Sequence, residues 1–235
     1  MIRSKRILYA FSGIFLAVEM VLGILLQIRE GREAAFCSYT AVVLACLFFA
    51  LFFERSCSYV FTQLALILTV CADYFLVWLE AQQRLPAMIF FLFAQLAYFL
   101  RLYWEEKDAK RRQWHLILRG SVSILALLVT WIVLGERADA LALISMLYYA
   151  NLLMNLLWSA AKLRTHWLLA LGFFLFLLCD TVIGLSLLGE YLPMAEDGWL
   201  HALLRPDFNL AWAFYLPSQV CLSLSLLPQR MNKRE

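Results

Sequence analysis

Two aspartates, Asp73 and Asp180, interrupt long apolar stretches of this sequence. Asp73 lies in LTVCADYFLV (residues 68–77) and Asp180 lies in FLLCDTVI (residues 176–183). An acid at the centre of a bilayer costs about 3 kcal/mol even on insertion scales, so such an acid indicates a functional site. A protonated carboxyl can act as a general acid, and an ionised carboxylate beside it as a general base. We therefore predict Asp73 and Asp180 to be the catalytic residues of an intramembrane site.

The composition indicates a protein that is embedded in lipid. Of the 235 residues, 64% are hydrophobic and 16% are charged, and the mean hydropathy is +0.76. A soluble domain has roughly 45–50% apolar and about 25% charged residues. The chain therefore has too little polar surface for a globule in water. We predict an all-α fold, a polytopic membrane helical bundle that forms a single domain over residues 1–235.

Apolar runs of about 20 residues, the length that crosses a bilayer as a helix, occur eight times. They lie near residues 7–27, 35–53, 58–79, 85–103, 115–134, 139–159, 167–188 and 209–227. Most of the 20 Lys and Arg residues fall on the side of the N-terminus, which predicts that both termini are cytoplasmic. We expect the first helix to be retained rather than cleaved as a signal peptide. The longest loop, near residues 189–208, is expected outside, as an interfacial lid or a plain connector.

Polar side chains recur at helical spacing inside several of the expected spans, so that they share a face. Polar groups that face lipid are costly, and these side chains should therefore meet around a polar interior. We predict that a cavity between the helices holds both acids and is lined by Gln95, Tyr98, Tyr148, Asn151, Asn155, Tyr215, Gln219 and Glu19. The amides can equally be hydrogen-bonding glue between helices. Arg119, near the inner end of its span, is expected to snorkel as an anchor.

Other kinds of site have little support in the sequence. The six cysteines form no C-x-x-C pair, and none of the three histidines lies deep in an apolar run. We therefore expect no metal and no cofactor. The net charge is +3, and the basic residues are explained by membrane topology. We therefore expect no nucleic-acid partner, and the sequence leaves the oligomeric state open.

Four segments together resemble the lysoplasmalogenase family, the YhhN-like membrane proteins. GFFLFLLCD (residues 172–180) resembles the family signature G-A-x-x-F-x-x-S-D, and the segment around Asp73 is similar to its G-D-x-x-L helix. FFLFAQLAYF (residues 90–99) resembles the F-x-x-A-H-x-x-Y helix, and FYLPSQ (residues 214–219) the closing Y-x-x-x-Q. The chain departs from the pattern at Gln95, where the family has His, and at Ala72 and Cys179. It also lacks an early K-P-L segment.

The resemblance implies an enzyme that cleaves the vinyl ether bond of lysoplasmalogens, or of a related ether lysolipid, by carboxyl general acid/base catalysis. The substrate would be a lysophospholipid or ether lipid. The protein would be a multi-pass membrane protein, in the cell membrane if the source is bacterial.

Two alternatives stay open. Paired intramembrane acids also mark proton-coupled transporters of small molecules or lipids, although transporters often have broken helices and only Pro217 lies inside a span here. The third candidate is a lipid-binding relative without catalysis.

Overall fold

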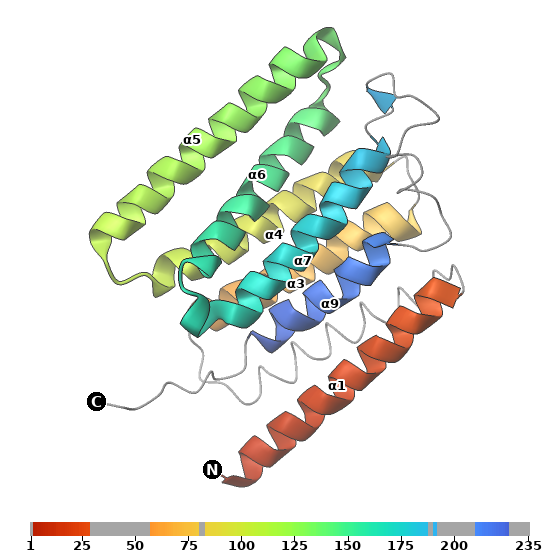
Figure 1. Ribbon diagram of the computed structural model, residues 1–235, viewed down its shortest axis with the longest axis vertical. Coiled ribbons are helices and arrows are strands. Elements are labelled where there is room, and N and C mark those ends of the chain that lie inside the picture. Colours follow the sequence, from red (N-terminus) through yellow and green to blue (C-terminus); the bar gives the residue numbers. More distant parts are fainter. Residues whose placement is uncertain (1, 29–56, 80–82, 188–189, 192–209, 226–235) are drawn as a thin grey trace.

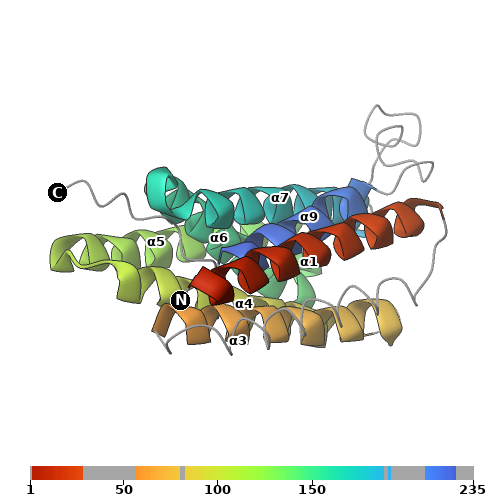
Figure 2. The same ribbon diagram turned by 90° about the horizontal axis from the view of Figure 1, so that it is seen from below.

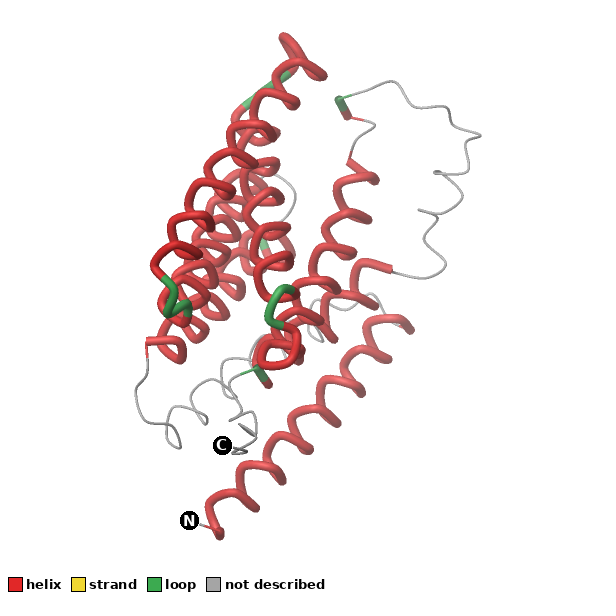
Figure 3. Tube along the Cα trace, turned by 60° about the vertical axis from the view of Figure 1, so that its left-hand side comes forward, coloured by secondary structure: helices red, strands yellow, loops and turns green. Residues whose placement is uncertain are grey.

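The computed structural model describes residues 2–28, 57–79, 83–187, 190–191 and 210–225. Most of these residues are helical, and no strand occurs in these ranges (Figure 3). The all-α fold class is therefore confirmed for the described part of the chain. The elements are α1 (Ile2–Ile28), α3 (Cys57–Asp73), the π-helix η1 (Tyr74–Trp78), α4 (Arg84–Glu105), α5 (Ala109–Leu134), the 3-10 helix η3 (Gly135–Arg137), α6 (Ala140–Ala160), α7 (Leu163–Leu187) and α9 (Leu210–Leu224).

Within the described residues, five helical segments are long and apolar enough to cross a membrane. They are Tyr59–Leu76, Arg84–Glu105, Ala109–Arg137, Ala140–Ala160 and Leu163–Leu187. Shorter apolar helices cover Tyr9–Leu25 and Leu210–Leu224. The predicted span 35–53 and nearly all of the loop 189–208 lie outside the described residues. The count of eight spans and the side of each terminus therefore stay predictions.

The helices form one bundle in which α5 and α1 lie on opposite flanks (Figure 1). Within the described chain, α5 packs chiefly against α6, and α1 against α9. Between the flanks, α3 pairs with α4 and α7 pairs with α9, and α3 and α7 lie on opposite sides of the bundle (Figure 2). Exposed side chains such as Ile124, Leu125 and Ile132 cover the outer face of α5. An apolar outer face suits contact with lipid, which replaces water around a membrane bundle.

The contact between α7 and α9 depends on a glycine. A Cβ atom at Gly172 would lie 2.8 Å from the side chain of Leu222 and 3.2 Å from its backbone nitrogen. Only glycine fits so close an approach without displacing the neighbouring helix. Gly172 is the first residue of the signature that ends at Asp180. The close packing therefore gives that glycine a physical role in positioning the helix that carries the acid.

Candidate functional site

A cavity of about 610 Å³ occupies one half of the bundle. Its wall combines the end of α5, the start of α6, the end of α7, the starts of α4 and α9, and the junction of α3 with η1. Most of the lining side chains are apolar, among them Leu76, Met88, Phe91 and Ile183. The volume falls in the range of roughly 300–1,000 Å³ that is typical of small-molecule sites. We call this space the central cavity.

Asp73 and Asp180 both line the central cavity. Asp73 is the last residue of α3, where the backbone changes to a π-helix, and it is only 3% exposed. π-Helical turns occur frequently at functional sites, where they redirect side chains. Tyr215 donates a hydrogen bond to Asp73, and Tyr148 donates one to Asp180. None of the ion pairs found in the described ranges involves either carboxyl group.

The two tyrosines are held in place by an aromatic frame. Tyr148 stacks on Phe91 with ring centroids 5.4 Å apart, and Phe176 packs edge-on against Phe91 at 5.9 Å. Phe176 also packs edge-on against Tyr215 at 5.6 Å. Phe176 is fully buried, and Phe91, Tyr148 and Tyr215 nearly so. Packed rings cannot change rotamer freely, and each tyrosine hydroxyl therefore keeps a fixed position toward its carboxyl group.

One edge of the central cavity is charged, and we call its residues Arg84, Glu190 and Tyr191 the rim. Nη1 of Arg84 donates to Oε2 and Oε1 of Glu190 at 2.8 and 2.9 Å. The hydroxyl of Tyr191 donates to Oδ1 of Asp139 at 3.2 Å, and Arg137 donates to the Tyr191 carbonyl at 2.8 Å. Burial, and after it the negative charge of Asp139, raise the pKa of Tyr191. The rim is thus a place where charged side chains meet an apolar cavity.

The predicted amides lie elsewhere, which corrects the expectation that they line the cavity with the acids. Nη1 of Arg119 donates to Oδ1 of Asn151 at 2.7 Å, and Nη2 donates to Oδ1 of Asn155 at 2.6 Å. Nδ2 of Asn155 in turn donates to Oε1 of Gln95 at 2.9 Å. Asn151 and Asn155 bind a cation of the neighbouring helix, and Asn155 also donates to Gln95 of α4, so these three amides make contacts of the kind that the alternative interpretation expects between helices.

The expectation that Arg119 snorkels to the membrane surface is wrong. Its side chain is 6% exposed, and its guanidinium lies over the ring of Phe99 at 4.4 Å. His115 is also fully buried; its Nε2 is 3.2 Å from Nη2 of Arg119, and its ring stacks on Trp158 at 4.0 Å. Arg119, His115, Asn151, Asn155 and Gln95 form what we call the Arg119 cluster. This cluster fastens α5 to α6 and α4 in the half of the bundle away from the cavity.

Four of the ten predicted site residues therefore meet in the central cavity, namely Asp73, Asp180, Tyr148 and Tyr215. The other six are not among the residues that line it. Besides the three amides of the Arg119 cluster, Tyr98 packs edge-on against Phe173 at 5.0 Å. Nε2 of Gln219 lies 3.4 Å from Oγ of Ser218, and Glu19 is buried on α1. The roles predicted for all ten residues stay predictions.

Several other residues that line the cavity were not predicted from the sequence. The hydroxyl groups of Tyr149 and Thr181 form a hydrogen bond of 2.8 Å. These residues directly follow Tyr148 and Asp180 in the sequence. Trp212 lies one turn before Tyr215, and Arg84 and Glu190 form the rim. One signal pointed to Arg84, because it is a basic residue in an expected outer loop, where Lys and Arg are scarce.

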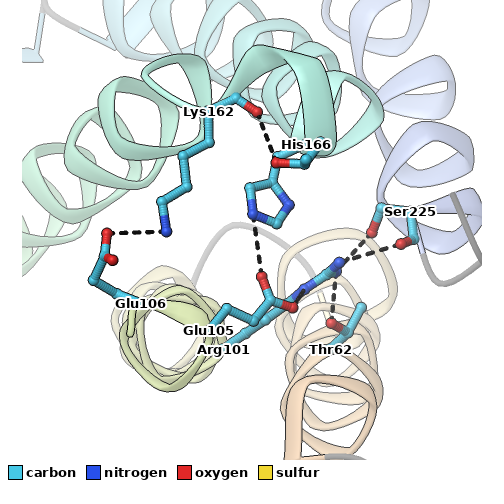
Figure 4. A network of polar contacts seen from close by, with 8 residues as sticks. Thr62, Arg101, Glu105, Glu106, Lys162, His166 and Ser225 are labelled. Carbon is cyan, nitrogen blue, oxygen red and sulfur yellow. Dashed lines mark hydrogen bonds and ion pairs between the residues drawn. The ribbon is translucent and has the colours of Figure 1, made fainter. Parts of the chain in front are cut away.

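A second polar network surrounds Arg101 (Figure 4), near the end of α4, the helix that begins at Arg84 of the rim. Nη1 of Arg101 donates to Ser225 at 2.7 Å and to Thr62 at 2.8 Å, and its Nε pairs with Glu105 at 3.2 Å. Glu105 also lies 3.4 Å from Nε2 of His166. These contacts tie α3, α4, α7 and the end of α9 together, and they involve no residue of the cavity wall.

The connection after α4 is fixed by an ion pair in the same region. Nζ of Lys162 lies 3.0 Å from Oε2 of Glu106 (Figure 4). Burial opposes ionisation of Glu106. The hydrogen bonds from Lys162 and from the backbone of Asp108, together with the positive charges of Lys162 and Arg111, nevertheless lower its pKa. Over the ranges that the structure covers, no group of three His, Cys, Asp or Glu side chains could hold a metal ion. The expectation of no metal and no cofactor stays a prediction.

Comparison with known proteins gives one match. The model of the YhhN family matches residues 34–226, which is most of the chain. All four motifs named above lie within the matched residues, as do Asp73, Asp180, Tyr148 and Tyr215. No curated protein and no solved structure matches the chain.

Proposed function

This protein belongs to the YhhN family, and from that premise we propose that it is a membrane-embedded hydrolase of lysoplasmalogens or related ether lysolipids. It would be a multi-pass protein, in the cell membrane if its source is bacterial. The observation that carries the proposal is the pair Asp73 and Asp180, which face one cavity and accept hydrogen bonds from Tyr215 and Tyr148. Acids inside a membrane protein that no basic group neutralises are candidates for proton chemistry.

The reaction needs one acid and one base in the same space. The protonated carboxyl gives its proton to the vinyl carbon distant from the ether oxygen, and the double-bond electrons form the new C–H bond. The resulting oxocarbenium ion is stabilised by the second carboxylate, which takes a proton from water as the water oxygen bonds to the cationic carbon. The hemiacetal then splits, and its hydroxyl proton passes to the glycerol oxygen. One water is consumed, and a fatty aldehyde and a glycerophospho-base are released.

The surroundings of the acids support this chemistry. The two tyrosine hydroxyls bind the carboxyl groups, and the buried rings of Phe91 and Phe176 pack against the two tyrosines. Fixed dipoles in a dry site stabilise developing charge more strongly than water does. The departure from the family His at Gln95 falls in the Arg119 cluster rather than on the cavity wall. The proposal therefore assigns no proton transfer to that position.

The test is release of aldehyde from a lysoplasmalogen by the purified full-length protein, compared with Asp73→Asn and Asp180→Asn. Each substitution keeps the size of the side chain but removes the acid, and we expect the rate to fall by about 10²–10⁴-fold. Asp108→Asn is the matched control. Asp108 caps α5 by accepting from the Lys110 backbone at 2.9 Å, and asparagine caps a helix equally well. Aldehyde release that survives either cavity substitution, or no release by the wild type, rejects the proposal.

A proton-coupled transporter is the second candidate, because the same pair of acids could carry protons. It is distinguished by a pH-driven flux into liposomes that contain the purified protein, without aldehyde release. A lipid-binding relative without catalysis would bind an ether lysolipid but give neither aldehyde nor flux. Measurements of aldehyde release, flux and lipid binding on one preparation of purified protein therefore distinguish the three functions.

A further inference from the structure

The rim contains an ion pair whose two members differ in depth. The side chain of Arg84 is 25% exposed and that of Glu190 is 51% exposed, and both line the central cavity. Only Nη1 of Arg84 contacts Glu190, and neither Nε nor Nη2 has a partner in the portion of the chain covered by the structure. A guanidinium offers five N–H donors in a fixed fork. Arg84 can therefore bind a further anionic group without giving up Glu190.

Much of the remaining cavity wall is apolar. Val129 and Val133 of α5 line the cavity and are 46% and 57% exposed. Leu134 and Leu187 extend the same wall. A hydrocarbon chain can lie against these side chains and continue into the surrounding lipid. The cavity wall thus combines apolar side chains, two acids and the charged rim.

We propose that the rim binds a zwitterionic head group, a phosphate followed by an ammonium, with Arg84 on the phosphate and Glu190 on the ammonium. The inference rests on the proposed function, from which it takes the ligand to be an ether lysolipid. Along such a lipid the order is chain, ether bond, phosphate and ammonium. The cavity wall offers a partner for each of these parts: apolar side chains for the chain, the two acids for the ether bond, Arg84 for the phosphate and the more exposed Glu190 for the ammonium.

Charge decides between the classes of head group. Arginine binds phosphate through parallel, charge-assisted hydrogen bonds. A phosphate without an ammonium would meet the negative charge of Glu190, and a head group without charge would leave both side chains unmatched. A zwitterion satisfies both charges and leaves the rim neutral. The rim therefore selects against both simpler head groups.

The test measures binding rather than hydrolysis, with lipids whose saturated alkyl ether bond cannot be cleaved. The purified full-length protein in detergent is titrated with an alkyl ether lysophosphocholine, an alkylglycerol phosphate and an uncharged alkylglycerol of the same chain length. We expect the phosphocholine lipid to bind about tenfold more tightly than either other lipid, as charge-assisted contacts at a half-exposed site allow. Arg84→Gln should remove the preference over alkylglycerol, and Glu190→Gln the preference over alkylglycerol phosphate.

Two controls separate recognition from a structural role of the ion pair. Arg111→Gln removes an exposed arginine whose Nε is 3.7 Å from Asp108, away from the cavity, and should leave all three affinities unchanged. Arg84→Glu combined with Glu190→Arg keeps an ion pair but brings a carboxylate to the phosphate position, so the preference should be lost. Equal binding of the three lipids by the wild type, or a preference that survives this exchange, overturns the inference. Selective binding without aldehyde release would instead reject the proposed hydrolase and leave the head-group site standing.

Discussion

The two halves of the bundle hold their buried charges in different ways. In one half, Arg119 gives hydrogen bonds to Asn151 and Asn155 from 2.6 to 2.7 Å and is covered by Phe99. In the other half, Asp73 and Asp180 each accept a hydrogen bond from a tyrosine and otherwise face a cavity of about 610 Å³. The cation is enclosed by fixed partners, whereas the acids border open space.

The difference indicates which buried charge is structural and which is available for chemistry. A charge surrounded by fixed hydrogen-bond partners holds helices together, and its removal leaves those partners unsatisfied. A charge that borders a cavity can exchange a proton with a bound molecule, and its removal changes activity more than folding. Substitutions around Arg119 should therefore change mainly stability, whereas substitutions around Asp73 and Asp180 should change mainly activity.

The largest effect on folding is expected in the Arg119 cluster. Arg119→Met keeps an unbranched side chain but leaves the oxygens of Asn151 and Asn155 without their donor. We expect the free energy of unfolding to fall by about 3 kcal/mol, as for the loss of several buried hydrogen bonds. The rate of aldehyde release per folded molecule should stay unchanged. Thermal unfolding in detergent and activity per folded molecule check both statements, and an active-site defect at unchanged stability would contradict them.

The tyrosines of the cavity should show the reverse behaviour. Tyr148→Phe and Tyr215→Phe keep the rings of the aromatic frame and remove only the hydroxyl donors to Asp180 and Asp73. A hydrogen bond to a charged group contributes about 1.5–3 kcal/mol, so each substitution should lower kcat by roughly 10–100-fold. The KM and the unfolding temperature should change little. A loss of stability without a loss of kcat would give the tyrosines a structural role only.

A smaller effect is expected where α7 and α9 touch. Gly172→Ala places a methyl group 2.8 Å from Leu222, and we expect it to cost about 1 kcal/mol of stability by overpacking. Gly120→Ala on α5 is the matched control, because among the described residues no heavy atom of another element lies within 4 Å of its Cβ position. Alanine favours a helix over glycine, so the control should be neutral or slightly stabilising. Equal melting temperatures of the two variants would contradict the close packing.

The smallest effect concerns the ion pair of Glu106 with Lys162. The pKa of Glu106 is lowered in the folded protein, so its contribution to stability is present above its ordinary pKa of 4.5 and is lost as the pH falls through the folded-state value. Glu106→Gln should cost about 1 kcal/mol or less at pH 7. Unfolding of the two proteins should become equally easy toward pH 3. If the difference in stability between the wild type and Glu106→Gln increased at acidic pH, the lowered pKa of Glu106 would be contradicted.

Much of the fold followed from the apolar pattern. Helices lie where the described chain overlaps the expected spans, because length and hydropathy alone decide which segments suit lipid. The family resemblance, which rests on Gly172, the segments around the two acids and the motifs at residues 90–99 and 214–219, is confirmed by the family match. The acids and the two tyrosines could be predicted to share a cavity, because intramembrane carboxyls and polar helical stripes face inward.

The partners of the amides could not be predicted, because spacing shows which face of a helix is polar but not what lies opposite. Asn151 and Asn155 accept hydrogen bonds from Arg119. The sequence alone instead predicts that Arg119 anchors its helix at the membrane surface. Arg84 and Glu190 are more than a hundred residues apart, and only the folded bundle joins them. Contacts between segments that are distant in the sequence are therefore the part of the site that could not be predicted from the sequence.

One measurement asks most directly whether the two acids work as a unit: aldehyde release by Asp73→Asn, by Asp180→Asn and by the protein with both substitutions. Residues that act together in one step show losses that do not multiply. The account predicts that the double variant is about as slow as the slower single variant. Losses that multiply would mean that Asp73 and Asp180 act independently, and would contradict a single intramembrane site.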